Sequence, residues 1–150
     1  MKYLLVLTVI ILGTISIYGA NARCYIPSPL EASNNAQVVF VGKVISVTDP
    51  GLPAGGLQFK VFDLQRLVTT RFVVDHVYRG KKFKEIEVAA RTGAEGYEFK
   101  VGRKYIVYAQ KGGDNEQGLV VKECGRTRLV SDAKEDLKLL GGLSKPEKER

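Results

Sequence analysis

Three side chains of the 150-residue sequence could ligate a transition metal or act as a thiol or imidazole catalyst: Cys24, His76 and Cys124. A structural zinc site normally takes four cysteine or histidine ligands, so this set is one short. The same shortage of cysteine and histidine ligands argues against a haem or iron–sulfur centre. We therefore expect neither a metal site nor a cofactor.

His76 is the single histidine and hence the main candidate for a general base. It shares one face of a predicted strand with Phe72 and Val74, which is typical of a histidine at the edge of a β-structure. A Ser-His-Asp triad with Ser46 or Ser131 is compatible with the spacing. However, no GxSxG or similar signature accompanies it.

Paired carboxylates are the other group that could work as acid and base. They occur at Asp132, Glu135 and Asp136, in a predicted helix, and at Asp114 and Glu116, in a predicted hairpin loop. Both sets are explained by a first helical turn that complements the helix dipole and by a solvated turn. The glycines at 51, 55 and 56 are not followed by the Lys-Ser/Thr of a phosphate-binding loop. We therefore expect no enzyme.

The N-terminus has the three parts of a signal peptide. Met1-Lys2 precedes an apolar run from Tyr3 to Tyr18, and Ala20-x-Ala22 supplies the small residues that signal peptidase needs. We expect cleavage after Ala22, which assigns residues 1–22 to the signal and leaves no membrane span. The alternative, an uncleaved anchor, needs about 20 apolar residues. The predicted location is extracellular, or periplasmic in a bacterium.

Export changes the interpretation of the two cysteines, because thiol pairs persist as disulfides in oxidising compartments. We expect a Cys24–Cys124 bridge. In the simple loop model a bridge across about 100 residues removes roughly 4–5 kcal/mol of unfolded-chain entropy. The alternative, a catalytic thiol or redox switch, lacks a CxxC motif.

The elements that must position these residues are mainly strands. β-Branched and apolar alternation predicts five strands, at 38–49, 67–78, 85–90, 103–110 and 118–124. Gly42 predicts a bulge or sharp coil in the first of them. A helical turn or two is expected at 29–35, and residues 50–65 are expected to be mostly loop.

After Arg128 the apolar period becomes helical, with Val130, Ala133, Leu137 and Leu140 on one face. Ser131 is the expected N-cap, and Gly141-Gly142 is the expected end. The predicted fold is all-β with a C-terminal helix: a five-stranded OB-fold, a Greek-key barrel, spanning 23–143. Residues 144–150 form a polar tail.

The chain carries 23 Lys and Arg against 16 Asp and Glu, a net charge of +7 that favours acidic partners. Basic residues cluster at Arg79, Lys81, Lys82 and Lys84 and at Lys100, Arg103 and Lys104. Tyr78, Phe83, Phe99 and Tyr105 lie among them. An OB-fold could use such a face to stack bases and neutralise phosphates. Binding of glycan, polyanion or nucleic acid is therefore our alternative function, although export makes nucleic acid a rarer partner.

Four segments, in their order and spacing, resemble the tissue inhibitors of metalloproteinases and the wider netrin-like domains. They are residues 36–44 (AQVVFVGKV), 72–80 (FVVDHVYRG), 99–109 (FKVGRKYIVYA) and the closing Cys124-Gly125-Arg126-Thr127-Arg128 before a helix. A cysteine near the predicted mature N-terminus precedes them. The resemblance covers nearly the whole mature chain and implies an OB barrel with flanking helices.

The chain departs from that family at the inhibitory centre. Family inhibitors begin Cys-x-Cys, and the amino group and carbonyl of the first cysteine bind the protease zinc. Here Ala22-Arg23-Cys24 keeps only the second cysteine, and no cysteine occurs near Gly93–Gly96 to pair with a first one. The pair Cys24 and Cys124 resembles the family's other bridge.

The resemblance implies a secreted binding module that docks on a protein partner, with an extracellular metalloproteinase as the implied partner class. The expected contact residues are Arg23, Cys24, Tyr25, Ile26 and Pro27, together with Ala94 and Glu95 of the Gly93–Tyr97 loop.

Overall fold

The computed structural model describes residues 24–50, 67–92, 96–113 and 118–143. Arg23, Ala94, Glu95, the predicted signal peptide, the predicted tail and most of the predicted 50–65 loop lie outside this part of the chain. The element order is α2 (Pro29–Asn35), β1 (Val38–Thr48), β2 (Leu67–Arg79), β3 (Glu85–Arg91), β4 (Lys104–Lys111), β5 (Leu119–Val121), β6 (Arg128–Leu129), the 3-10 turn η1 (Val130–Asp132) and α3 (Lys134–Leu143).

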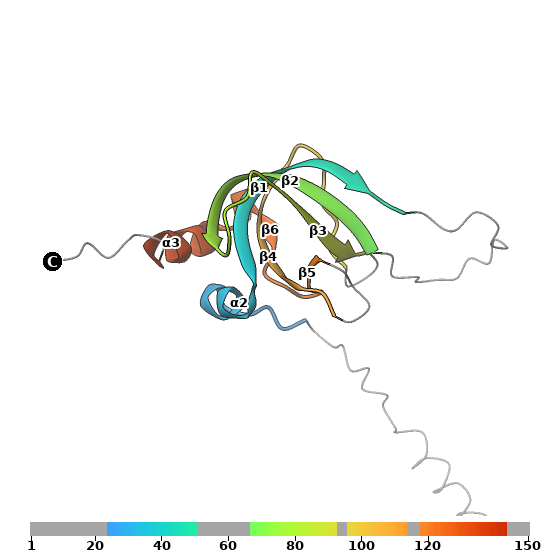
Figure 1. Cartoon of the computed structure of the whole chain (residues 1–150). Coiled ribbons are helices and arrows are strands. Elements are labelled where there is room, and N and C mark those ends of the chain that lie inside the picture. Colours follow the sequence, from blue (N-terminus) through green and yellow to red (C-terminus); the bar gives the residue numbers. More distant parts are fainter. Residues whose placement is uncertain (1–23, 51–66, 93–95, 114–117, 144–150) are drawn as a thin grey trace, which may run out of the picture.

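The predicted fold class is confirmed: five strands form a closed mixed barrel of the OB type, followed by a C-terminal helix (Figure 1). The strand order is β1-β2-β3-β5-β4, and a further β1–β4 pairing closes the sheet on itself. All of these pairs are antiparallel except β3–β5, which is parallel. Closure gives each of the five barrel strands a hydrogen-bonded neighbour on both sides.

Strand β1 belongs to two cores at once because successive side chains of a strand point to opposite faces. Phe40 faces the barrel interior, where it meets Phe72 edge to face at 5.3 Å between ring centroids. Val39 and Val41 face outward into a second core with Ala36 of the preceding segment. This double burial explains why the strand is apolar on both faces.

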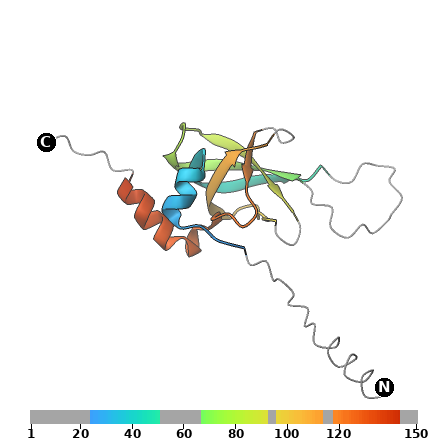
Figure 2. The same ribbon diagram turned by 90° about the horizontal axis from the view of Figure 1, so that it is seen from below.

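The second core is built by the two helices. The buried side chains there are Ala32, Ala36, Val39, Val41, Ile106, Tyr108, Ala133 and Leu140. Figure 2 shows α2 and α3 next to each other on one side of the barrel. The outward faces of β1 and β4 are therefore covered on this side, and the helices are fixed by apolar contacts with them.

Gly42 is the expected irregularity in β1. The β1–β2 register shifts between Val41 and Gly42, and a Cβ built on Gly42 would lie only 2.8 Å from the Val73 carbonyl oxygen. The prediction of a bulge is confirmed, and the close approach of β2 explains why glycine is required.

Several predicted boundaries are wrong. A sixth strand, Arg128–Leu129, pairs with β4, and β5 is shorter than predicted. The chain leaves β5 because Gly125 N–H bonds the Lys122 carbonyl, and this turn places Cys124 at a φ of 56°.

The start and end of the C-terminal helix also differ from prediction. Ser131 is not an N-cap, because it lies within η1 and its hydroxyl donates to Asp132. Gly141 and Gly142 lie inside α3 rather than ending it. The buried Leu140 beside them shows the physical reason: tertiary packing outweighs the roughly 1 kcal/mol helix penalty of each glycine.

Candidate functional site

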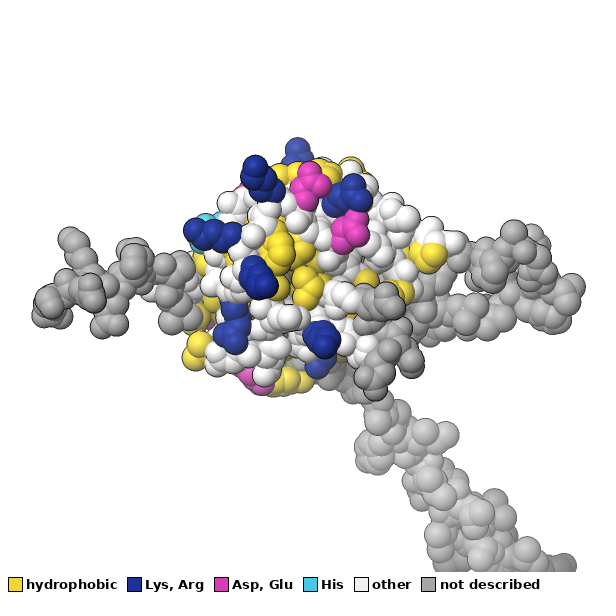
Figure 3. Space-filling model, in the orientation of Figure 1, with side chains coloured by type: hydrophobic (Ala, Val, Ile, Leu, Met, Phe, Trp, Pro, Cys, Tyr) yellow, Lys and Arg dark blue, Asp and Glu magenta, His cyan; other side chains and the backbone are white. Residues whose placement is uncertain are grey.

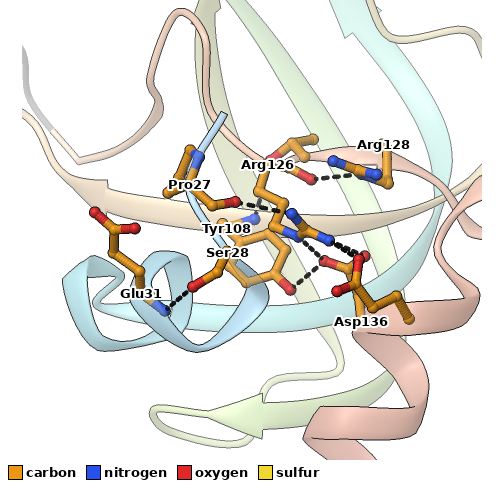
Figure 4. Close-up of polar contacts among 9 residues, drawn as sticks. Pro27, Ser28, Glu31, Tyr108, Arg126, Arg128 and Asp136 are labelled. Atoms are coloured by element: carbon orange, nitrogen blue, oxygen red, sulfur yellow. Dashed lines mark hydrogen bonds and ion pairs between the residues drawn. The ribbon is translucent and has the colours of Figure 1, made fainter. Parts of the chain in front are cut away.

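The N-terminal segment, which we define as residues 24–27, is held at both ends. A disulfide joins Cys24 to Cys124, as predicted. At the other end, Arg126 Nη1 donates a hydrogen bond of 2.8 Å to the Pro27 carbonyl (Figure 4). Between them, the Tyr25 hydroxyl donates to Glu31 at 2.9 Å. Four of the seven predicted contact residues thus form one restrained segment.

This restrained segment nevertheless exposes apolar side chains. Tyr25 is 72% exposed and Ile26 is 55% exposed. Leu30, in the first turn of α2, is 47% exposed. A side chain that is fixed in place and apolar gains more by contact with another protein than by contact with water.

Helix α2 fixes the direction in which the segment leaves the barrel. Ser28 is its N-cap, with Oγ accepting from the Glu31 N–H, and Pro29 occupies the first helical turn. Both residue types are favoured at these positions because they satisfy or remove an unpaired N–H. Ala32 and Ala36 then pack on the outer face of the barrel.

A buried network of ion pairs attaches the N-terminal segment to the rest of the fold. Arg126 is 7% exposed and Asp136 is fully buried. Arg126 Nε donates to Asp136 Oδ1 at 2.6 Å, and Nη2 donates to Glu135 at 2.6 Å. The Tyr108 hydroxyl also donates to Asp136 Oδ1 at 2.6 Å (Figure 4). One carboxylate thus connects β4, α3 and the turn after β5.

The pKa values in this network follow from burial and from Asp136. Burial acts to lower the pKa of Arg126, but the hydrogen bonds and charges of Asp136 and Glu135 outweigh it and raise that pKa. Burial, and then the hydrogen bond to Asp136, raises the pKa of Tyr108 above its ordinary value. The network therefore consists of a charged arginine and a neutral phenol around one carboxylate.

A cavity of about 490 Å³ lies beside the N-terminal segment. Its lining includes Tyr25, Pro27, Glu31, Tyr108 and Arg126. The segment and the 122–126 turn thus flank a hollow in which a partner's side chain could lie.

The loop after β3 starts at the same end of the barrel. Arg91 Nη1 lies 3.9 Å from Glu123 Oε1, and Glu123 is adjacent to Cys124. The loop is closed by a hydrogen bond from Tyr97 N–H to the Arg91 carbonyl. A Cβ on Gly96 would overlap the Arg91 backbone, so glycine is required there. The residues that flank this loop therefore lie near the bridged cysteines, whereas Ala94 and Glu95 themselves are outside the described residues.

Two of the four aromatic side chains of the alternative basic face are not accessible for stacking. Phe99 and Tyr105 are buried in the barrel interior, at 8% and 3% exposure. Tyr105 points inward from β4, and Phe99, in the segment before β4, packs edge to face on Phe72 and Tyr105. Figure 3 shows Lys and Arg side chains scattered over one face, with acidic and apolar groups between them. Lys104 is itself paired with Asp75 at 2.7 Å.

His76 is exposed on β2, and its ring contacts Tyr78 at 4.5 Å between centroids. His76 lies opposite Val41 in β1, whereas Ser46 lies opposite Arg71. At about 3.3 Å per strand residue, Ser46 is roughly 16 Å along the strand from His76's partner. The alternative of a triad that joins His76 to Ser46 is therefore not formed.

Within the four described ranges, no three His, Cys, Asp or Glu side chains gather as metal ligands. In the same ranges, no helix is long and apolar enough to cross a membrane.

No family model matches the sequence, and no curated protein matches it. The functional argument therefore rests on the fold and on the geometry of the restrained segment.

Sequence reasoning missed the Arg126–Asp136 pair. Asp136 was interpreted as a helix-dipole residue, and its position in the first turn of α3 fits that interpretation. The available signal was its helical spacing: Asp136 lies three residues after Ala133 and four before Leu140, on the buried face. A carboxylate on an apolar helix face predicts a buried cationic partner.

We predict that Asp136→Asn destabilises the protein by about 3–5 kcal/mol, because it leaves the buried Arg126 charge without its main partner. Glu135→Gln is the matched control. Its side chain is 72% exposed, so its loss should cost less than about 1 kcal/mol. Chemical denaturation measures both. Equal effects of the two substitutions would contradict the assigned role of Asp136.

Tyr108 should make stability depend on alkaline pH. Its folded pKa is raised, so its contribution is constant below about pH 10 and is lost as the unfolded chain ionises above it. The slope from this group reaches up to about 1.4 kcal/mol per pH unit. Tyr108→Phe should therefore reduce the loss of stability in denaturation measured between about pH 8 and 11. Parallel curves for the two proteins would contradict this assignment.

Proposed function

We propose that this protein is a secreted, non-enzymatic binding module that docks on a protein partner through its N-terminal segment. The observation that carries the proposal is the combination of exposure and restraint at Tyr25 and Ile26. Both side chains are apolar and exposed, yet they lie between a disulfide and a partly buried hydrogen bond to Pro27. Such groups are typical of pre-organised contact residues.

The restraint matters because ordering a flexible segment opposes binding. Immobilising one side chain at an interface costs about 0.5–1.5 kcal/mol, and fixing each backbone residue costs about 1–2 kcal/mol. In this segment the backbone is already tied at Cys24 and Pro27. A partner would therefore bind it with little further loss of entropy.

Secretion is part of the proposal. The disulfide is consistent with an oxidising compartment, and the signal-like N-terminus indicates export. We also propose kinship with the tissue inhibitors of metalloproteinases and netrin-like domains. It is supported by the OB-type barrel, by the Cys24–Cys124 bridge and by the four resembling segments.

We expect inhibition of zinc endopeptidases to be weak or absent, despite this kinship. With cleavage after Ala22, the terminal amine belongs to Arg23, one residue before the anchored Cys24. An amine ligates zinc only when neutral and well positioned, and its unperturbed pKa is about 7.7–8.0. The Arg23 guanidinium would also meet Zn²⁺ as a like charge.

The assay uses protein whose N-terminus is verified as Arg23, against a panel of metalloproteinases. Stoichiometric inhibition that disappears on acetylation of the N-terminus would show that the missing first cysteine does not matter.

The non-enzymatic assignment predicts that the activity of the protein in hydrolase panels stays at background. A turnover abolished by His76→Ala would overturn the non-enzymatic assignment.

The second candidate function is binding of a polyanion through the β2–β3 turn. Arg79, Lys81, Lys82 and Lys84 are all exposed there, and within the described residues none of them forms an ion pair. Such a cluster attracts sulfated glycans or nucleic acid by a mechanism that salt weakens strongly.

Pull-down from the extracellular fraction of the producing organism separates the two functions. We predict a retained protein partner that resists high salt and that is lost with Ile26→Ser. Val101→Ser is the matched control, because Val101 is an apolar side chain of similar exposure, 62%, on another turn. Retention unchanged by Ile26→Ser, or release of an acidic polymer by salt, would favour the basic turn instead.

A further inference from the structure

The open end of the barrel contains a second cavity, separate from the N-terminal segment. It has a volume of about 210 Å³ and is lined by residues of β1, β2, β3 and the segment that leads into β4. The end of β1, the start of β2 and the end of β3 meet there (Figure 1). An engineered apolar cavity of about 150 Å³ holds benzene, so this one has room for a single aromatic ring.

The walls of this cavity are mainly apolar, although Thr70 and Thr92 are among the lining residues. Val68 and Ala90 are buried, and Phe99 closes the inner part by stacking edge to face on Phe72. Val47 and Tyr97 contribute the outer part and are partly exposed. These walls favour a flat or aliphatic group over a polar one.

One polar atom in the cavity wall has no partner. Thr70 is 1% exposed, and its Oγ1 forms no hydrogen bond with any of the described residues. Thr70 lies opposite Val47 and Val88 on the inward face of β2, deeper than Val68. A buried hydroxyl without a partner costs about 1–3 kcal/mol, so a valine would be the more stabilising residue at this position.

The charged residues at the entrance of the cavity indicate the sign of the charge on the ligand. Asp49 and Glu98 are the charged residues among the described lining, and both are exposed. No lysine or arginine of the described chain lines this cavity. Among the described residues, the rim is therefore acidic, in a chain with a net charge of +7. An ammonium group would be attracted at the rim and a carboxylate repelled.

We propose that the barrel mouth binds a small amphipathic amine, with an apolar ring or chain in the cavity, a hydroxyl that hydrogen-bonds Thr70 at the inner end, and an ammonium group at the Asp49 and Glu98 rim. This site is independent of the docking segment, and neither needs the other.

The probes are tyramine, phenethylamine and 3-(4-hydroxyphenyl)propionate, which share a ring and differ in the inner hydroxyl or the outer charge. Methyl resonances of Thr70, Val68 and Ala90 report binding by NMR titration. We expect tyramine to bind about two- to tenfold more tightly than phenethylamine, the contribution of one hydrogen bond. We expect the propionate to bind most weakly.

Thr70→Val is the decisive variant, because it keeps the shape of the side chain and removes the hydroxyl. The preference for tyramine over phenethylamine should disappear, and the melting temperature should not fall. Thr69→Val, on the outward face of the same strand, is the matched control and should keep the preference. Thr70→Ser keeps a hydroxyl at this position and should keep the preference for tyramine over phenethylamine. Glu98→Gln should reduce the preference for tyramine over the propionate.

A tyramine preference that survives Thr70→Val, or the absence of a saturable shift with any probe, would overturn the proposal. The same chemistry could come from a free amine or from a peptide with an N-terminal tyrosine. Tighter binding of tyramine than of Tyr-Gly-Gly identifies the free amine, and the reverse order identifies a peptide N-terminus.

Discussion

The ion pair between Arg126 and Asp136 is the interaction on which the helical side of the molecule depends. A charge moved from water into a protein interior loses several kcal/mol of solvation, which only a close and complete set of partners can offset. Asp136 has that set in the Arg126 guanidinium and the Tyr108 hydroxyl. Arg126 completes its own set with Glu135 and the Pro27 carbonyl. The positions of α3, β4 and the N-terminal segment are therefore coupled.

This coupling explains how a short segment outside the barrel can present a defined surface. The disulfide fixes Cys24 to the turn after β5, and Arg126 in the same turn fixes Pro27. Two residues lie between these anchors, and their side chains point to solvent although their backbone is restrained. The residues of a binding surface restrained in this way are positioned as well as residues on a helix or strand, although the segment is neither.

The sequence predicts the strands well, because their composition is a local property. It does not predict which face of β1 or β4 is inside, since the barrel core and the helices make both faces apolar. Phe99 and Tyr105 are misassigned for a related reason: their lysine and arginine neighbours indicate a surface, but Tyr105 points inward from β4, and Phe99, in the segment before that strand, packs into the same core. The helical spacing of Asp136 predicts a buried cationic partner but does not identify it as Arg126, because the turn after β5 and helix α3 meet only in the folded chain.

The Arg126–Asp136 network and the barrel mouth differ in whether their buried polar groups have hydrogen-bond partners. On the helical side, Arg126, Asp136, Tyr108 and Thr127 all have partners, and Thr127 accepts a hydrogen bond from the Tyr108 N–H. Groups that satisfy one another in this way are a structural device, because each would destabilise the fold without its partner. At the barrel mouth, Thr70 has no such partner among the described residues. A strand position opposite Val47 and Val88 would accept valine on grounds of packing alone, so packing does not account for the hydroxyl, which the proposed ligand would bind.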